Sequence, residues 1–232
     1  MAEKLKLNNI TIVAMTSVNV TKTIKAIEYS MKNIDFGDAI LITHKKPFFL
    51  PKNIRYQHTS RLNNINDFNY KMVYELHKYI KTDYALIVHA DGFVVNPQSW
   101  RDSFLEYDYI GAPWPIPEPN DVISYRDKDN NLYRVGNSVS IRSKLIMELP
   151  SKINLKWEKI NGWYNEDGFL CVHNRKLLEK YGVKYAPVEE AAKFSRENSI
   201  PENIGIEPFC FHKWHGENAK YPKFTSIPFL KY

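Results

Sequence analysis

The chain has 232 residues, of which 44% are hydrophobic and 25% charged, and this composition is typical of one globular domain. Its formal net charge of +6 is spread along the chain and suits anionic ligands in general, such as phosphates, acidic glycans or membrane surfaces. Two cysteines, Cys171 and Cys210, are too few for a disulfide scaffold, so we expect a reduced, intracellular environment.

The sequence contains no apolar run that approaches the roughly 18 residues of a membrane span. Its basic first residues are followed by no apolar stretch of the kind found in signal peptides. We therefore expect a cytoplasmic protein, and peripheral association with a membrane stays open.

The first half of the chain alternates short apolar runs with segments of helical spacing. Strands are predicted at residues 10–15, 39–43, 54–59 and 84–88, and helices within residues 20–34 and 65–80. Strands and helices that alternate in this way predict an α/β fold with a mainly parallel central sheet flanked by helices.

A carboxylate interrupts the apolar segment "YALIVHADGFVVNP" (residues 84–97) directly after its predicted strand. In parallel sheets ligands bind at the carboxyl ends of strands, and His89 to Gly92 occupy that position. Asp91 and Gly92 also suit a tight turn, and for this segment considered alone the turn is the favoured interpretation.

The segment "GAPWPIPEPND" (residues 111–121) has a proline at every second position from Pro113 to Pro119. This pattern excludes a helix or a central strand and predicts a long extended loop. Strand-like alternation resumes over residues 132–143 and is interrupted at Gly136 and Asn137. Long ordered loops often bind ligands, so we interpret the proline segment as an excursion from one sheet.

A helix is predicted to follow Asn165 and to end near Gly182, with Glu166 and Asp167 in its first turn. Carboxylates at a helix start are stabilised by the free N–H groups and the dipole, by roughly 0.3 to 1 kcal/mol each. Alternatively, one of the two projects into a cleft as a general base. The periodicity leaves both interpretations open.

Two histidines, His212 and His215, lie among aromatic residues near the C-terminal end, in a segment without helical spacing. Histidine is a frequent metal ligand, and Asp91 is a candidate partner across a cleft. A histidine among aromatic residues is more often simply packed and hydrogen-bonded.

Five segments in order are similar to successive motifs of a family of predicted GT-A-fold glycosyltransferases. They are "LIVHADGFVVNPQSW", "FLEYDYIGAPW", "VGNSVSIRS", "NEDGFLC" and "AAKFSRE", and they lie between about residues 66 and 212. The resemblance implies one GT-A-like domain over residues 1–232, with a nucleotide-binding half at about 1–97 and an acceptor-side half at about 98–232.

The resemblance further implies a hexosyltransferase-type enzyme, active in polysaccharide biosynthesis. It would move a sugar from a nucleotide-sugar donor to a glycan, lipid-linked or protein acceptor, and would invert the anomeric centre. Nucleic acid is not an expected partner. A divalent cation, Mn2+ or Mg2+, is the expected cofactor.

The same resemblance assigns roles to individual residues. Asp167 matches the catalytic base, and Asp91 with His212 matches the metal ligands. The implied donor-binding residues are Thr16, Ser17, Asp91, Gly92, Gly136 and Asn137. Secondary candidates are His89, Glu166 and His215.

Two departures from the family pattern bear on these roles. His89 stands at the first acidic position of the metal motif, and Mg2+ and Mn2+ prefer oxygen ligands. Ser138 and Val139 stand where the pattern has two glycines, which leaves less room for a ligand beside the backbone.

Two other classes of protein stay open. One is a non-catalytic relative that binds a nucleotide sugar, and the other is a metal-dependent phosphoesterase or nuclease that uses Asp91, Asp167 and His212. No P-loop and no Gly-x-Gly-x-x-Gly pattern follows the first predicted strand, which counts against kinases and dinucleotide enzymes.

Overall fold

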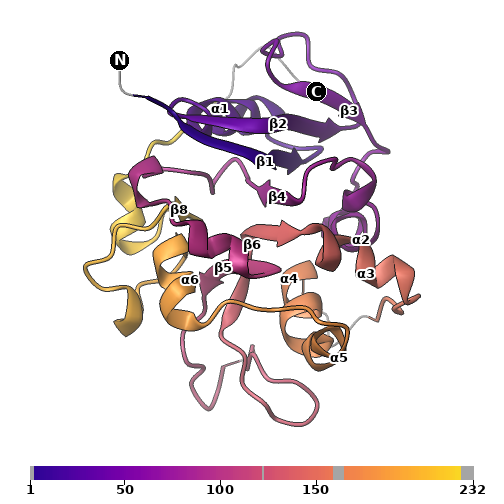
Figure 1. Ribbon diagram of the computed structural model, residues 1–232, viewed down its shortest axis with the longest axis vertical. Helices are drawn as coiled ribbons and strands as arrows, with labels where there is room; N and C mark the ends of the chain where they lie inside the picture. Colours follow the sequence, from indigo (N-terminus) through magenta and orange to yellow (C-terminus); the bar gives the residue numbers. More distant parts are fainter. Residues whose placement is uncertain (1–2, 122, 159–164, 226–232) are drawn as a thin grey trace.

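The computed structural model describes residues 3–121, 123–158 and 165–225 (Figure 1). Their strands are β1 (Leu5–Met15), β2 (Ile34–Thr43), β3 (Arg55–His58), β4 (Tyr84–Ile87), β5 (Tyr109–Pro113), β6 (Val135–Ser143), β7 (Ser195–Arg196) and β8 (Cys210–Phe211). Six of them form one sheet in the order β3-β2-β1-β4-β6-β5, and β7 pairs with β8.

Most of the central sheet is parallel. β1 pairs in parallel with β2 and with β4, and β2 pairs in parallel with β3. β6 runs antiparallel to both of its neighbours, β4 and β5. The predicted α/β class with a mainly parallel sheet flanked by helices is therefore confirmed.

The helices are α1 (Val20–Ser30), α2 (Ile65–Tyr74), α3 (Lys144–Lys152), α4 (Glu166–Gly168), α5 (Arg175–Lys180) and α6 (Val188–Phe194). α1 packs on β1 and β2, while α2 lies beside α3 and α4, and α6 packs against β5 (Figure 1). The apolar runs of β1 and β2 are buried almost without interruption, because the sheet is covered on both faces. In the described part of the chain no helix has the length and apolar character needed to cross a membrane.

The predicted strands and helices of the first half are confirmed, but several of their ends differ. β1 and β2 begin earlier than predicted, and α1 ends at Ser30, so Ile34, which the helical spacing included, is the first residue of β2. The helix predicted within residues 65–80 ends at Tyr74, and a 3-10 turn (Leu76–Lys78) follows. Leu76 and Ile80 are nevertheless buried, so the apolar periodicity correctly marked the side that faces the sheet.

The second half differs more from expectation. β5 and α3 were not predicted, and β5 ends at Pro113, where the alternate prolines begin. A proline is tolerated there because β5 is an edge strand of the sheet. The helix predicted after Asn165 is divided into α4, a π-helical turn (Phe169–His173) and α5.

The parallel strands bring three loops to one edge of the sheet. Met15 at the end of β1 is paired with Ile42 of β2, and Val13 of β1 is paired with Ile87 at the end of β4. The loops that leave β1, β2 and β4 therefore begin side by side, and the candidate site lies among them.

Candidate active site

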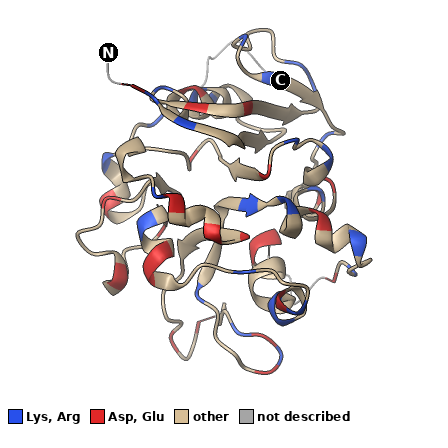
Figure 2. Ribbon diagram, in the orientation of Figure 1, with Lys and Arg blue, Asp and Glu red and all other residues tan. Residues whose placement is uncertain are grey.

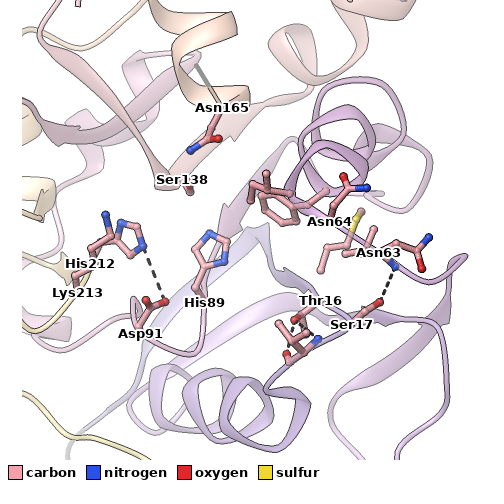
Figure 3. A pocket seen from close by; sticks show the side chains of 15 residues that line it. Thr16, Ser17, Asn63, Asn64, His89, Asp91, Ser138, Asn165, His212 and Lys213 are labelled. Carbon is pink, nitrogen blue, oxygen red and sulfur yellow. Dashed lines mark hydrogen bonds and ion pairs between the residues drawn. The ribbon is translucent and has the colours of Figure 1, made fainter. Parts of the chain in front are cut away.

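A cavity of about 480 Å³ opens at the carboxyl edge of the sheet (Figure 3). Its walls come from the loops after β1 and β4, the start of α2, the middle of β6, the N-terminal side of α4 and the segment after β8. The lining residues are Met15, Thr16, Ser17, Val18, Leu62, Asn63, Asn64, Ile65, Phe68, His89, Asp91, Ser138, Asn165, His212 and Lys213.

One wall is built from two segments that hydrogen bonds hold together. The Thr16 hydroxyl donates to the Val18 carbonyl at 2.5 Å, and the Ser17 hydroxyl accepts from the Leu62 N–H at 2.9 Å. Asn64 caps α2, because its side-chain oxygen accepts from the backbone N–H groups of the first helical turn. Thr16 and Ser17, which the sequence placed near a bound nucleotide, thus line a fixed wall of the cavity.

Beside this wall, residues 89 to 92 form the tight turn that the sequence suggested. The His89 N–H donates to the Gly92 carbonyl at 2.7 Å, and the Gly92 N–H donates back to the His89 carbonyl at 3.3 Å. The Asp91 carboxylate is not needed for this turn: its side chain is 46% exposed, and Oδ1 faces His212 Nε2 at 4.0 Å (Figure 3). Asp91 therefore both lies in the turn and presents a carboxylate to the cavity.

Gly92 allows the His212 ring to approach this turn. A Cβ atom at Gly92 would lie 2.8 Å from Cδ2 of His212 and 2.5 Å from Cγ2 of Val139, closer than side chains pack. Burial lowers the pKa of His212, although the neighbouring Glu197 and Asp91 raise it, and the net shift is downward. The ring is therefore neutral at pH 7 and keeps a nitrogen lone pair.

Glu197, a buried carboxylate behind the cavity, connects two of its segments. It accepts a hydrogen bond from Asn137 Nδ2 at 2.6 Å and another from Lys213 Nζ at 2.5 Å. Its Oε1 also lies 3.5 Å from Nδ1 of His212. Glu197 therefore fixes β6 and the segment after β8 relative to each other.

Lys213 places a positive charge in the cavity next to Asp91. Its backbone N–H donates to the Asp91 carbonyl at 2.7 Å. Burial lowers the pKa of Lys213, but the hydrogen bond to Glu197 and the charges of nearby carboxylates raise it more, so the side chain stays protonated. Glu197 lies in the quoted "AAKFSRE" segment and Lys213 follows His212, but no local sequence pattern marked either residue.

Three of the predicted donor-binding residues, Gly92, Gly136 and Asn137, are not among the residues that line the cavity, and neither is Asp167. Gly136 packs under Trp114, where a Cβ atom would lie 1.9 Å from the indole ring. Asn137 is buried with a left-handed φ of 79°, and its side chain bonds Glu197. Their donor-binding role stays a prediction. Ser138 does line the cavity, whereas Val139 is buried in the core.

Glu166 and Asp167 have different environments, although they are neighbours in sequence. Glu166 is fully buried and pairs with the equally buried Arg142, with Nη2 and Oε1 3.0 Å apart. Arg142 also donates to the Tyr109 hydroxyl at 3.2 Å. The Glu166 carboxylate thus forms an internal ion pair with Arg142.

Asp167 is half-buried, and its Oδ1 accepts the Gly168 N–H at 2.8 Å. Burial and the negative charge of Glu166 raise the pKa of Asp167 to about 7. A carboxyl group that titrates near neutral pH suits proton transfer. Asn165 makes no side-chain cap within the described residues; its Oδ1 accepts from Asn69 Nδ2 at 3.3 Å.

The two secondary histidines differ in position. His89 lines the cavity, and its ring centroid lies 5.7 Å from that of His212. Burial and the proximity of His212 lower the pKa of His89, so this ring is also neutral. His215 precedes a 3-10 turn (Gly216–Lys220) and is not among the residues that line the cavity.

The donor atoms at the cavity fit a cation that the protein and a ligand hold jointly. The described residues contain no group of three His, Cys, Asp or Glu arranged around a metal position. Asp91 and His212 offer one carboxylate and one neutral imidazole 4.0 Å apart. Two ligands of an octahedral ion with bonds of about 2.1 Å are about 3.0 to 4.2 Å apart, so this pair fits two positions of such an ion.

The fold and the cavity define an α/β protein with a cavity at the carboxyl edge of its parallel strands, the edge at which such sheets bind ligands. The chain belongs to the family described as "Protein of unknown function (DUF5672)", whose model matches residues 52–212. A comparison with curated proteins finds no match.

Solved structures that are similar to this chain include three glycosyltransferases. GlyE of Streptococcus pneumoniae TIGR4 has 11% identity over 97% of this chain, with a TM-score of 0.45. A glycosyltransferase involved in glycosylation of the major capsid of PBCV-1 has 13% identity over 90% of this chain and 95% of its own, with a TM-score of 0.48. The mannosyltransferase PcManGT of Pyrobaculum calidifontis, in complex with GDP-Man and Mn2+, has 8% identity over 76% of this chain, with a TM-score of 0.42.

This chain spans 57% of the length of GlyE and 53% of that of PcManGT. Because none of the three TM-scores reaches 0.5, no residue role is transferred from these structures.

Because the pKa of Asp167 is raised, we expect this residue to make the free energy of unfolding depend on pH. A carboxyl group whose pKa is about 7 when folded and near 3.8 when unfolded stabilises the fold at low pH, and this contribution is lost as pH rises towards 7. Asp167→Asn should therefore raise the free energy of unfolding at pH 8 by on the order of 4 kcal/mol. The difference should vanish below pH 4. Urea unfolding at both pH values measures it.

Asp127 is the matched control, because its shift has the opposite sign. Burial raises the pKa of Asp127, but hydrogen bonds from Asn131 and the Asp129 N–H lower it to about 2. Asp127→Asn should destabilise the protein at pH 8. Equal effects of the two substitutions at pH 8 would contradict the environment described for Asp167.

Proposed function

We propose that this protein is a glycosyltransferase that moves a sugar from a nucleotide-sugar donor to an acceptor hydroxyl with inversion. The observation that carries the proposal is the cavity in which Asp91, His212 and Lys213 meet, at the carboxyl edge of the parallel strands. The ordered sequence motifs that are similar to those of GT-A-fold glycosyltransferases also support it.

The cavity offers different chemistry on its two sides. Polar side chains and backbone from Thr16, Ser17 and the start of α2 suit a nucleoside. Asp91, His212 and Lys213 suit a diphosphate, Lys213 by direct attraction and the other two through a cation. A volume of about 480 Å³ is within the usual range for such ligands.

A cation, if used, would be held by Asp91 and His212 together with donor phosphate oxygens. Bound there, it would neutralise the negative charge that grows on the leaving diphosphate. The Lys213 ammonium lies beside the same position and supplies a positive charge of its own. His89 adds a second neutral imidazole, which is compatible with the departure of this chain from the usual acidic metal motif.

In the proposed reaction an acceptor hydroxyl attacks the anomeric carbon from the face opposite the diphosphate. The new carbon–oxygen bond forms while the bond to the phosphate oxygen breaks, and the electron pair leaves with the diphosphate. The ionised Asp167 carboxylate accepts the hydroxyl proton. One displacement of this kind inverts the anomeric centre. Glu166 is kept for its ion pair with Arg142 and does not take part.

Donor binding is tested first with the parent protein. A thermal-shift screen of nucleotide sugars, with and without Mn2+, should find a donor that raises the melting temperature, because a ligand of the folded state stabilises it. Turnover of that donor separates an enzyme from a non-catalytic binding relative. A chain stabilised by none of the nucleotide sugars would contradict the proposal and leave the phosphoesterase alternative.

Asp91→Asn should keep the fold and weaken binding of the donor found in that screen by roughly 10-fold or more, because it removes one charged contact. Isothermal titration with and without Mn2+ measures the affinity. Asp83→Asn is the control, since Asp83 is exposed just before β4, at its other end. If Asp91→Asn binds as tightly as Asp83→Asn under both conditions, Asp91 only turns the chain.

Asp167→Asn should lower turnover by 10²- to 10⁴-fold, because the amide cannot accept a proton at neutral pH. Donor affinity should change little. The parent rate should fall as pH drops below about 7, and the variant should lack that limb.

Glu166→Gln is a control for an effect on stability. It leaves the buried Arg142 guanidinium without its countercharge, so it should lower the free energy of unfolding by about 3 to 5 kcal/mol. Near-parental turnover in Asp167→Asn with chemistry rate-limiting, or a product that keeps the donor's anomeric configuration, would refute the role of Asp167.

A further inference from the structure

The loop that joins β2 to β3 exposes two large aromatic side chains. Phe48 is 81% exposed and Phe49 is 63% exposed, and their rings meet edge to face with centroids 4.7 Å apart. The loop lies at the upper end of the molecule in Figure 1, beside β3. Phenylalanine is usually buried, so two adjacent exposed rings on one short loop indicate a contact surface.

The loop is anchored on both sides of this aromatic pair. Pro47 is buried, and Leu50 packs against the main core. Ile54 is buried, and its N–H donates to the Pro51 carbonyl at 3.0 Å. Pro47, Leu50 and Ile54 thus pack inside the protein, whereas Phe48 and Phe49 stay exposed.

The charged residues of this loop are all lysines. Lys45, Lys46 and Lys52 are exposed, and in the described parts of the chain they form no ion pair within 4.0 Å. Residues 39–66 contain five Lys or Arg and no Asp or Glu. Within residues 3–121, 123–158 and 165–225, Arg55 alone among these five pairs with a carboxylate, that of Asp38. Figure 2 shows basic segments around β3 and its adjoining loops.

We propose that this loop binds a membrane surface that contains anionic phospholipids, with Phe48 and Phe49 inserted among the headgroups. Exposed aromatic rings enter the boundary between headgroups and acyl chains, and flanking lysines attract anionic lipid. The lysines complement a negatively charged surface, and no acidic side chain within residues 39–66 would be repelled by it. This charge pattern favours a lipid surface over a protein partner.

The position of the loop relates the membrane to the cavity. The Thr16 N–H donates to the Ile42 carbonyl at 3.0 Å, so the chain leaves β2 beside a residue that lines the cavity. The loop therefore begins at the edge of the sheet where the cavity opens, and it then crosses to the start of β3, which runs parallel to β2. The proposal of membrane binding is independent of the proposed function. Only the suggestion that it brings the cavity to a lipid-linked acceptor rests on that function.

Co-sedimentation of the full chain with lipid vesicles tests the proposal. The parent should bind vesicles of phosphatidylcholine mixed with phosphatidylglycerol at least about tenfold more tightly than phosphatidylcholine alone, and added salt should weaken this binding. The double variant Phe48→Ser/Phe49→Ser should bind the mixed vesicles about tenfold more weakly or worse. So should the triple variant Lys45→Gln/Lys46→Gln/Lys52→Gln.

Ile204→Ser is the matched control, because Ile204 is 71% exposed and lies outside this loop. It should bind like the parent, and unchanged melting temperatures should show that all variants are folded. Absence of parental binding, equal binding to both lipid mixtures, or parental affinity in the phenylalanine double variant would each overturn the proposal. If the parent binds no vesicles but self-associates, and the phenylalanine double variant does not self-associate, the loop is instead a protein interface. The screen of nucleotide sugars is a separate measurement. Failure of the membrane proposal can therefore be distinguished from failure of the proposed glycosyltransferase function.

Discussion

The Glu197 carboxylate is the interaction on which the candidate site depends. A buried carboxylate is tolerated only when hydrogen bonds or cations compensate its charge, and here Asn137 and Lys213 do so. These two partners belong to β6 and to the segment after β8. Compensating one charge therefore draws the last part of the chain against the strand ends, where His212 meets Asp91.

A second buried charge, the Arg142–Glu166 pair, determines the properties of its neighbour. Glu166 stays beside Asp167 as a negative charge, and together with burial it makes ionisation of Asp167 difficult. Adjacent residues in a helix point about 100° apart, so one carboxylate enters the core while the other stays half-buried. Two similar side chains thereby acquire different properties: Glu166 forms a buried ion pair, and the pKa of Asp167 is raised to about 7.

The sequence was informative where local pattern alone decides the outcome. Apolar periodicity located the strands and helices of the first half, and the end of a strand located Asp91, because parallel strands present their carboxyl ends at one edge. Thr16 and Ser17 were assigned by the resemblance alone. The sequence missed Glu197 and Lys213 because their importance comes from partners far along the chain. Gly136 belonged to a recognised motif, yet it packs against Trp114, and no local pattern indicates which neighbour a glycine faces.

The long-range origin of the site also affects how the protein is made. The sheet is complete once β6 has been synthesised, but Glu197, His212 and Lys213 lie more than fifty residues further along the chain. Because synthesis proceeds from the N-terminus and domains tend to fold as units, the sheet edge emerges from the ribosome well before its last wall. The nascent chain thus passes through a stage in which Asp91 and the turn around it have no partner ring to pack against.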